Sequence, residues 1–228
     1  MAKDRKGELY TLPTGIEAEI DGMTGHEEDL LANEKLVKSG KAIEGILKGC
    51  ILKLDGKKPS SADIANMVAP DRRTALLRLR ELTYGPEVEV EVQCGCKHTT
   101  HTTVRLDQLE NRPMPEDMDT IDIQGTTVTL RFLQGKDEQK IAKEDNDRIT
   151  VAMLLQIEEI EGVHRNGYRQ WLKDLPSRER LKLRRALEGR DCGIMSSRVE
   201  VECDNCGKAN TVAVEGQSGF FFPQNEME

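Results

Sequence analysis

The sequence is 228 residues long, with 37% hydrophobic residues, 32% charged residues and a formal net charge of −8. This length can bury a core without disulfides. The negative charge disfavours a general nucleic-acid binder, because attraction to phosphate dominates sequence-independent binding. No apolar run approaches the roughly 18 residues that span a bilayer, and the charged start, MAKDRKGELY, is unlike a signal peptide. The composition therefore predicts a cytosolic protein with no membrane partner.

The first half of the chain is expected to begin with a hairpin and continue as helices. Residues 9–23 alternate at period two in IEAEI, which predicts a hairpin or an edge strand. Thr24 and Glu27 have the spacing of a capping box, so a helix should run from there to about Ser39. Apolar residues then recur at helical intervals from Ile43 to Leu54, which predicts a second helix.

Proline and glycine mark where the next helix should begin and end. Ser60 and Ser61 can cap a short helix, and Pro70 suits the first turn of the helix that follows. Gly85 and Pro86 end that pattern, and EVEVEV alternates as a strand that leads into a turn rich in cysteine. Helical structure therefore gives way to β-structure at this point.

A second hairpin and further helices are expected after an acidic linker, NRPMPEDMDT. The run IDIQGTTVTLRF predicts a hairpin that turns near Gly125. Residues 136–161 have apolar residues at helical spacing and predict two helical pieces, broken near residues 145–147. A final helix should start at Ser177 and end near Gly189, before a second cysteine-containing turn. The sequence shows no internal repeat other than the two cysteine turns.

These two turns carry the chemistry that we expect. Cys203 and Cys206 have the two-residue spacing that lets both thiolates reach one ion from a tight turn between strands. A redox C-x-x-C motif would instead lie at the start of a helix. In the first turn, Cys94 and Cys96 are the preferred ligands, because thiolates suit Zn²⁺. We predict one structural Zn²⁺ bound by all four cysteines.

Other ligands remain open for the first turn. Cys94 and Cys96 are one residue apart, which places side chains on opposite faces of a regular strand unless the turn begins at Cys94. His98 and His101 are therefore alternates. Cys50 falls on an apolar helical stripe, which predicts that it packs as a small hydrophobic residue. Cys192 is a weaker alternative ligand for the first turn. A metal ion that links Cys96 to Cys203, 107 positions apart (203 − 96), would restrict the unfolded chain. The lost entropy of the unfolded state would stabilise the fold by about 4 to 5 kcal/mol.

The sequence contains no familiar catalytic motif and predicts neither an enzyme nor a small-molecule substrate. Phosphate-binding glycine loops, a G-x-S-x-G turn and H-E-x-x-H are all missing from it. Residues 165–190 carry nine basic and three acidic side chains. This segment is either a solvated helix surface or a site for an acidic partner. As an alternative function, this segment could serve a zinc-ribbon nucleic-acid-binding or transcription adaptor, although the negative charge of the whole chain disfavours nucleic acid as a partner.

Three aromatic residues at the end of the chain form a candidate contact for partners. Phe220, Phe221 and Phe222 are three of the four phenylalanines and precede Pro223. Such a segment either folds back on its own core or docks on another protein, where aromatic anchors supply much of the binding energy. The two alternatives carry equal weight from the sequence.

Taken together, these segments resemble the T-even-type baseplate protein family of contractile-tailed bacteriophages. The resemblance rests on LPTGIEAEIDGMTGHEEDLLAN, DRRTALLRLRELTYGPEVEVEV, LPSRERLKLRRALEG, CDNCG and the terminal FFFP, in that order. It implies a component of the tail baseplate, or a factor that assembles the baseplate hub. Such a protein is made in the host cytoplasm and binds other tail and baseplate proteins, either in the finished virion or only as a chaperone of assembly.

The fold class that we expect is α+β, with helical blocks plus antiparallel hairpins. The two distant cysteine turns would form one split, zinc-ribbon-like site. Residues 1–110 would make an N-terminal region of strands and helices that ends in the first cysteine turn. Residues 111–190 would make an inserted, mainly helical region with a hairpin. Residues 191–228 would add the second cysteine turn and the aromatic tail, forming one unit with the first turn.

Overall fold

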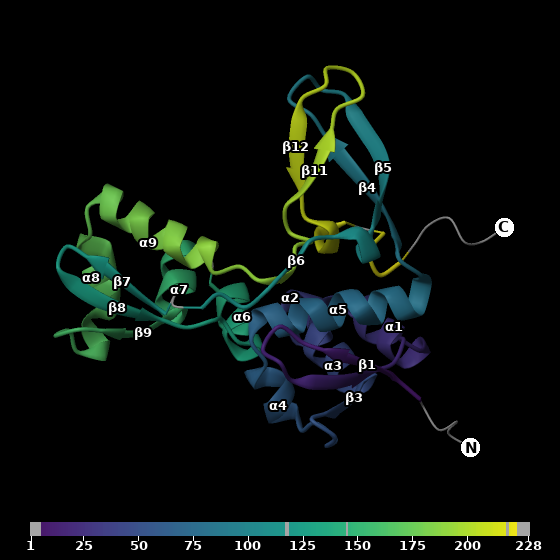
Figure 1. Cartoon of the computed structure of the whole chain (residues 1–228), viewed down its shortest axis with the longest axis horizontal. Coiled ribbons are helices and arrows are strands. Elements are labelled where there is room, and N and C mark those ends of the chain that lie inside the picture. The colour runs from purple at the N-terminus through teal and green to yellow at the C-terminus, as the bar shows by residue number, and fades with distance from the viewer. Residues whose placement is uncertain (1–5, 117–118, 145, 218, 223–228) are drawn as a thin grey trace.

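The computed structural model describes residues 6–116, 119–144, 146–217 and 219–222. The fold is α+β, as expected, and Figure 1 shows three parts. We call residues 8–84 the first block, residues 120–189 the second block, and the two cysteine-containing hairpins together the hairpin arm. In Figure 1 the arm rises above the first block and the second block extends to its left. Among the described residues, no helix combines the length and apolar character needed to cross a membrane.

The first block packs helices against a three-stranded antiparallel sheet in the order β1-β2-β3. Its core includes Ile20, Ile46 and Leu79, none of which is exposed. The elements are β1 (Glu8–Thr11), β2 (Glu17–Ile20), α1 (Gly25–Ala32), α2 (Glu34–Lys38), α3 (Lys41–Cys50), β3 (Ile51–Leu54), α4 (Ser61–Asn66) and α5 (Ala69–Tyr84).

Local signals set most of these helix ends. The capping box of Thr24 and Glu27 begins α1, and Pro70 lies in the first turn of α5, both as predicted. The single helix expected from 24 to 39 is wrong. Asn33 adopts an extended backbone and its side chain caps α2, so two short helices form instead of one.

The hairpin arm consists of two separate antiparallel hairpins. They are β4 (Glu87–Gln93) with β5 (Thr99–Arg105), and β11 (Val199–Glu202) with β12 (Ala209–Val212). Along β4 the valines are buried and the glutamates are exposed, as the EVEVEV alternation predicts. Val88 and Val90 share a core with Val201 of the other hairpin, so apolar side chains hold the two hairpins together.

A short antiparallel pair connects the second block to the rest of the chain. β6 (Asn111–Arg112), in the predicted linker, pairs with β10 (Gly193–Ile194). The linker therefore contains a strand that the sequence did not indicate. Here the chain enters and leaves the second block side by side. The expected division at residues 110 and 190 stays a prediction, and this pairing is compatible with it.

The second block has its own three-stranded antiparallel sheet, in the order β7-β8-β9. Its core includes Ile123, Val128 and Leu183, each at most 1% exposed. The elements are β7 (Thr120–Ile123), β8 (Thr126–Leu130), α6 (Gly135–Ala142), α7 (Arg148–Leu155), β9 (Ile157–Ile160), α8 (Tyr168–Asp174) and α9 (Ser177–Gly189). The hairpin that turns near Gly125 and the helix at 177–189 are confirmed.

Two helices predicted from apolar spacing end early and continue as strands. Residues 51–54 form β3 and residues 157–160 form β9. In each strand the pairing register shifts, because one extra residue opposes the middle strand. That bulge places residues three apart on the same face, so Ile157 and Ile160 are both buried. A bulged strand therefore produced the spacing that we had interpreted as a helix.

The order of elements recurs along the chain. Each block runs from a hairpin through helices to a bulged third strand and two more helices, and a cysteine-containing hairpin follows. The sequences ILKLDG, from Ile51, and IEEIEG, from Ile157, coincide at a separation of 106 positions (157 − 51), as do Pro70 and Pro176. The chain is thus built as two repeats, contrary to the expectation of no repeat beyond the cysteine turns.

Candidate metal centre

The first cysteine turn joins β4 to β5 and is closed by backbone hydrogen bonds. The N–H of Cys94 donates to the carbonyl of His98 at 2.9 Å, and the N–H of Lys97 donates to the carbonyl of Cys94 at 2.8 Å. Lys97 has a left-handed backbone, with φ of 70°. Because the turn begins at Cys94, Cys96 lies within the turn and is not held on the opposite face of a strand.

The second turn joins β11 to β12 with the same hydrogen-bond plan. The N–H of Cys203 donates to the carbonyl of Lys208 at 3.0 Å, and the N–H of Gly207 donates to the carbonyl of Cys203 at 2.8 Å. Gly207 has φ of 67°, so it fills the left-handed position that Lys97 occupies in the first turn. Glycine adopts this conformation without a steric cost.

The two turns bring four sulfur atoms together. The Sγ atoms of Cys94 and Cys206 are 3.7 Å apart, and those of Cys96 and Cys203 are 3.6 Å apart. All four Sγ atoms lie within 4.8 Å of one another. A tetrahedral Zn²⁺ with Zn–S bonds of about 2.3 Å would hold sulfurs about 3.8 Å apart. The four thiols are too far apart for disulfides, which need about 2.05 Å, and they match the spacing of a tetrathiolate site.

Backbone N–H groups point at these sulfurs and influence their protonation. The N–H of Cys96 lowers the pKa of Cys94, and the N–H of His98 lowers the pKa of Cys96. Burial opposes ionisation of Cys203, but the N–H groups of Cys206 and Asn205 still hold its pKa below the ordinary value. The N–H of Lys208 favours ionisation of Cys206, yet the neighbouring thiols raise its pKa to about 11.

Contacts between the hairpins support the cluster from outside. The N–H of Asp204 donates to Oγ1 of Thr100 at 3.2 Å, and the amide of Asn205 donates to the sulfur of Cys96 at 3.7 Å. Cys94 and Cys203 are buried, whereas Cys96 and Cys206 are exposed. With four sulfurs arranged around one point, such a site would leave no open position for a substrate.

The alternate ligands lie apart from this group. His98 contributes its backbone to the first turn, and its side chain is exposed. His101 lies on β5 opposite Glu91, also exposed. Cys50 is buried in the core of the first block, as predicted. Cys192 is buried next to the sulfur of Met114, at 3.7 Å. Among the described residues, only the four turn cysteines form a cluster suited to a metal.

The aromatic tail folds back on its own chain, the first of the two alternatives. Phe220 is 1% exposed and packs edge-to-face on Phe221, with ring centroids 4.7 Å apart. Phe221 contacts the cores of both the first block and the hairpin arm. Phe222 is 46% exposed. A role in binding a partner therefore stays a prediction and concerns mainly Phe222.

A buried arginine that the sequence analysis missed holds this tail in place. Arg80 of α5 is 1% exposed and donates to the carbonyls of Phe220, Gly85 and Glu87. These groups belong to the tail, the end of α5 and the start of β4. Arg80 sits at a helical position within a run of charged residues, so no local signal distinguished it from the exposed arginines nearby.

The basic segment 165–190 is partly neutralised within the chain. Arg169 and Lys173 both pair with Asp147 at 3.0 Å, and Arg190 pairs with Asp119 at 2.6 Å. Arg180 donates to the hydroxyl of Thr150. These partners weaken the case for a nucleic-acid surface, which depends on cations free to contact phosphates.

Comparison with known proteins adds one match. A family model described as "T4 bacteriophage base plate protein" matches residues 8–222, which is nearly the whole chain. No curated protein and no solved structure matches the chain. The matched span includes both blocks, both cysteine hairpins and the aromatic tail.

Proposed function

Since the chain belongs to the T4 bacteriophage base plate protein family, we propose that it is a non-enzymatic structural or assembly component of the phage tail baseplate. It acts by binding other tail and baseplate proteins, either in the virion or during assembly of the baseplate hub in the host cytoplasm. In this role the hairpin arm and the two blocks provide a rigid set of surfaces. A small-molecule substrate is not part of the proposal.

A structural Zn²⁺ completes the proposed scaffold. Cys94, Cys96, Cys203 and Cys206 would hold it, and the ion would supply a fixed, closed link between the two hairpins. The observation that carries the proposal is the distance of 3.6 to 3.7 Å between paired sulfurs from turns 107 positions apart. Four thiolates around one point favour zinc over harder cations, which prefer oxygen ligands.

Metal content of the full-length protein tests this assignment. We expect one zinc per chain by elemental analysis, and loss of that zinc in the double variant Cys94→Ser, Cys96→Ser. The matched control is His98→Ala with His101→Ala, which changes two residues of the same hairpin and should keep the zinc. Removing zinc with a chelator should lower the melting temperature, because the ion closes a long loop.

Two outcomes would contradict the zinc proposal. If the native protein contains no stoichiometric zinc, the zinc proposal is wrong, and a redox role becomes the better explanation of the four cysteines. Zinc lost in the histidine variant and retained in the cysteine variant would place the ion on other ligands. The structural role in the baseplate has a separate test, which is whether tails assembled with the cysteine variant still contain a complete baseplate.

A further inference from the structure

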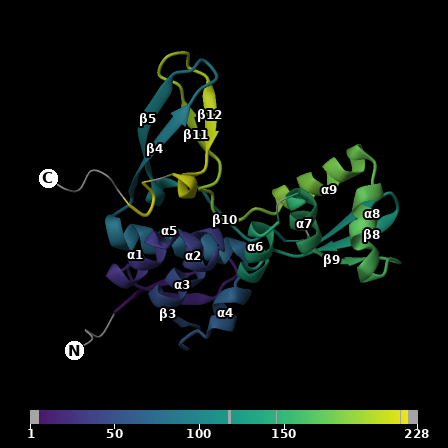
Figure 2. The same ribbon diagram turned by 180° about the vertical axis from the view of Figure 1, so that it is seen from behind.

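An open groove of about 330 Å³ lies between β5 and β11, one strand from each hairpin of the arm. Five consecutive residues of β5, 100–104, form one wall, and Glu200, Val201, Glu202 and Asp204 form the other. Both views show that the arm rises from the first block and stands clear of the second (Figures 1 and 2). The groove therefore lies on a part of the molecule that another chain can approach.

The hydrogen-bond register of the first hairpin determines which backbone groups of β5 are left unpaired. In an antiparallel pair, every second residue bonds to the opposite strand and the residues between them point outward. The bond from the N–H of Cys94 to the carbonyl of His98 sets this alternation at the turn. His101 and Thr103 then fall on outward positions, so their N–H and C=O groups point away from β4, along the open edge of β5.

The edge of β4 is covered by the protein itself, whereas the edge of β5 is open. On β4 the N–H of Glu91 also points outward, and it donates to the side-chain oxygen of Gln217 at 2.9 Å. Among the described residues, β5 pairs only with β4, and no hydrogen bond reaches the outward backbone groups of His101 and Thr103. These groups can therefore bond to an added strand.

Strand β5 also lacks the features that usually prevent pairing at an edge. Thr99–Arg105 contain no proline or lysine, and the pairing with β4 has no bulge. Thr102 is exposed, although Thr100 and Val104 on the same face of the strand are buried. An extended segment along β5 would both complete its hydrogen bonds and cover Thr102.

The charge of the groove indicates which kind of segment would bind there. Glu200, Glu202 and Asp204 line it, and no lysine or arginine does. None of these three carboxylates makes an ion pair with a described residue. Three carboxylates in one groove repel one another, and a cationic partner would relieve that repulsion. The groove therefore favours a segment rich in lysine or arginine and disfavours nucleic acid.

We propose that this groove binds an extended, basic segment of another baseplate protein, which adds to β5 as a further strand. The backbone of the segment would bond to His101 and Thr103, and its cationic side chains would face Glu200, Glu202 and Asp204. In this mode of binding, backbone hydrogen bonds supply affinity and the charges supply selectivity. The inference rests on the proposed function, because it names the kind of partner that the scaffold binds.

Peptide binding to the full-length, ¹⁵N-labelled protein tests the proposal. The probe is a seven-residue peptide in which lysine alternates with valine and threonine. We expect saturable shifts of the NMR signals of amides 99–105, and no shifts with a peptide that has glutamate in place of lysine. Thr103→Pro removes an outward donor and no bond to β4, so it should weaken binding about tenfold. The double variant Glu200→Gln, Glu202→Gln should weaken it by a similar factor of about ten.

Thr211→Pro is the matched control for the proline variant. Thr211 pairs with Glu200 and is exposed on β12, and the bond from the N–H of Cys203 to the carbonyl of Lys208 places it on an outward position. It does not line the groove, so this proline should change affinity less than about twofold. Circular dichroism checks that both variants fold.

Two N-methylated peptides test the strand pairing on the native protein, so this test does not depend on the folding of a variant. One peptide carries methyl groups on its odd-numbered amides and the other on its even-numbered amides. Successive N–H groups of a strand point to opposite edges, so only the set that faces β5 should abolish binding.

Several results would overturn the proposal. These are no saturable binding of the lysine peptide, equal weakening by the two proline variants, equal binding of the two methylated peptides, and equal binding of the glutamate peptide. Binding that the double glutamine variant leaves unchanged also overturns it. Zinc content and baseplate assembly test the proposed function separately, so a failure of peptide binding would leave that function standing.

Discussion

Arg80 shows how one side chain can link elements that are distant in the sequence. Its guanidinium donates to three backbone carbonyls, and one of these belongs to Phe220, 140 positions away. Buried carbonyls without donors are costly, and a buried cation without acceptors is more costly still. The helix, the hairpin arm and the tail therefore all depend on this one residue.

Replacing Arg80 should destabilise the protein strongly. In Arg80→Met the stem is kept and the donors are lost, so we expect the free energy of unfolding to fall by about 3 to 5 kcal/mol. Arg78→Met, two residues away, removes an ion pair with Glu81 that is about a quarter exposed, and should cost about 1 kcal/mol or less. Urea unfolding measures both. Equal losses of unfolding free energy in the two variants would mean that water molecules replace Arg80 as the donors to the three carbonyls.

The phenylalanines of the tail should differ sharply in their effect on stability. Phe220→Ala removes a ring that is 1% exposed and should cost about 3 to 5 kcal/mol. Phe222→Ala removes a ring that is 46% exposed and should change stability by no more than about 0.5 kcal/mol. Thermal unfolding of the two variants makes the comparison. A large loss in Phe222→Ala would show that Phe222 is a core residue rather than a candidate partner contact.

At the scale of elements, the sequence predicted structure well where local chemistry decides it. The capping box at Thr24, the proline at the start of α5 and the alternation in β4 all appear as expected. The sequence failed to predict the structure of segments whose conformation depends on pairing between distant strands. β3 and β9 have helical apolar spacing, and only their bulged pairing with β2 and β8 makes them strands. The pairing of β6 with β10 likewise leaves no local signal in two residues.

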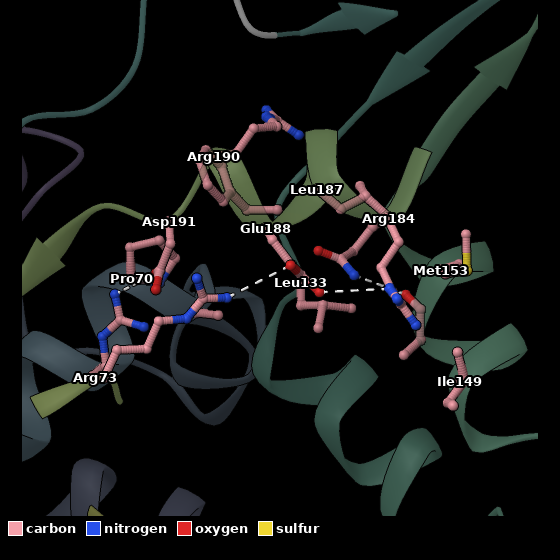
Figure 3. Close-up of a pocket in the computed structure, with 15 residues that line it drawn as sticks. Pro70, Arg73, Leu133, Ile149, Met153, Arg184, Leu187, Glu188, Arg190 and Asp191 are labelled. Atoms are coloured by element: carbon pink, nitrogen blue, oxygen red, sulfur yellow. Dashed lines mark hydrogen bonds and ion pairs between the residues drawn. The ribbon is translucent and has the colours of Figure 1, made fainter. Parts of the chain in front are cut away.

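The clustering of the four cysteines was predictable from the sequence, whereas their role as metal ligands stays a prediction. The two-residue spacing indicated Cys203 and Cys206, and the preference of Zn²⁺ for thiolates indicated Cys94 and Cys96; the structure brings all four together. A pocket lined by residues that include Pro70, Ile149 and Leu187 (Figure 3) gave no signal, because its walls come from α5, α7 and α9, which are far apart in the sequence. The repeat was hidden for a related reason: the blocks share an order of elements, and only short stretches such as ILKLDG and IEEIEG keep a visible likeness.

The start of α6 should make stability depend on pH. Asp137 is fully buried there; burial would raise its pKa, but hydrogen bonds from Arg131 and Lys140 outweigh burial and leave the pKa below the ordinary value. A carboxylate with a lowered pKa contributes stability above its unfolded pKa of about 3.9, and this contribution is lost as the pH falls through the folded pKa. α6 should therefore weaken in acid.

Asp137→Asn tests this linkage. At pH 7 the variant should be less stable by roughly 1 to 3 kcal/mol, and the difference from the native protein should shrink as the pH falls below about 4. Urea unfolding between pH 3 and pH 7 measures it. Asp174→Asn, at an exposed position on α8, is the control and should change stability by about 0.5 kcal/mol or less. A difference that stays constant down to pH 3 would exclude Asp137 as the source.

At the scale of the whole molecule, separate cores divide the protein into parts that need not respond together. The hairpin arm has a core made mainly of valines, whereas the second block is built around residues such as Val128 and Leu183. The proposed zinc links only the two hairpins of the arm. Phe221 and Leu77 join the arm to the first block. The destabilisation that follows metal loss should therefore reach the first block before the second block.

Hydrogen exchange should reveal this unequal response. Treating the zinc-loaded protein with a chelator should speed amide exchange in β4, β5, β11 and β12, with smaller changes in α5. Exchange in α7 and α9 should stay the same, because the second block keeps its own core. Mass spectrometry of peptic fragments resolves these segments. Faster exchange throughout the chain would show one cooperative unit and would contradict the division into separate cores.

The distance along the chain between the two cysteine turns also sets an order of events during synthesis. Cys96 leaves the ribosome 107 residues before Cys203. At about 5 to 20 residues per second, translation separates them by roughly 5 to 20 s. During that interval the first turn has only two of the four thiolates, while the second block is still being made. The four-cysteine cluster can therefore form only after that block has emerged, so under the zinc proposal a complete site marks a chain whose translation has passed Cys206.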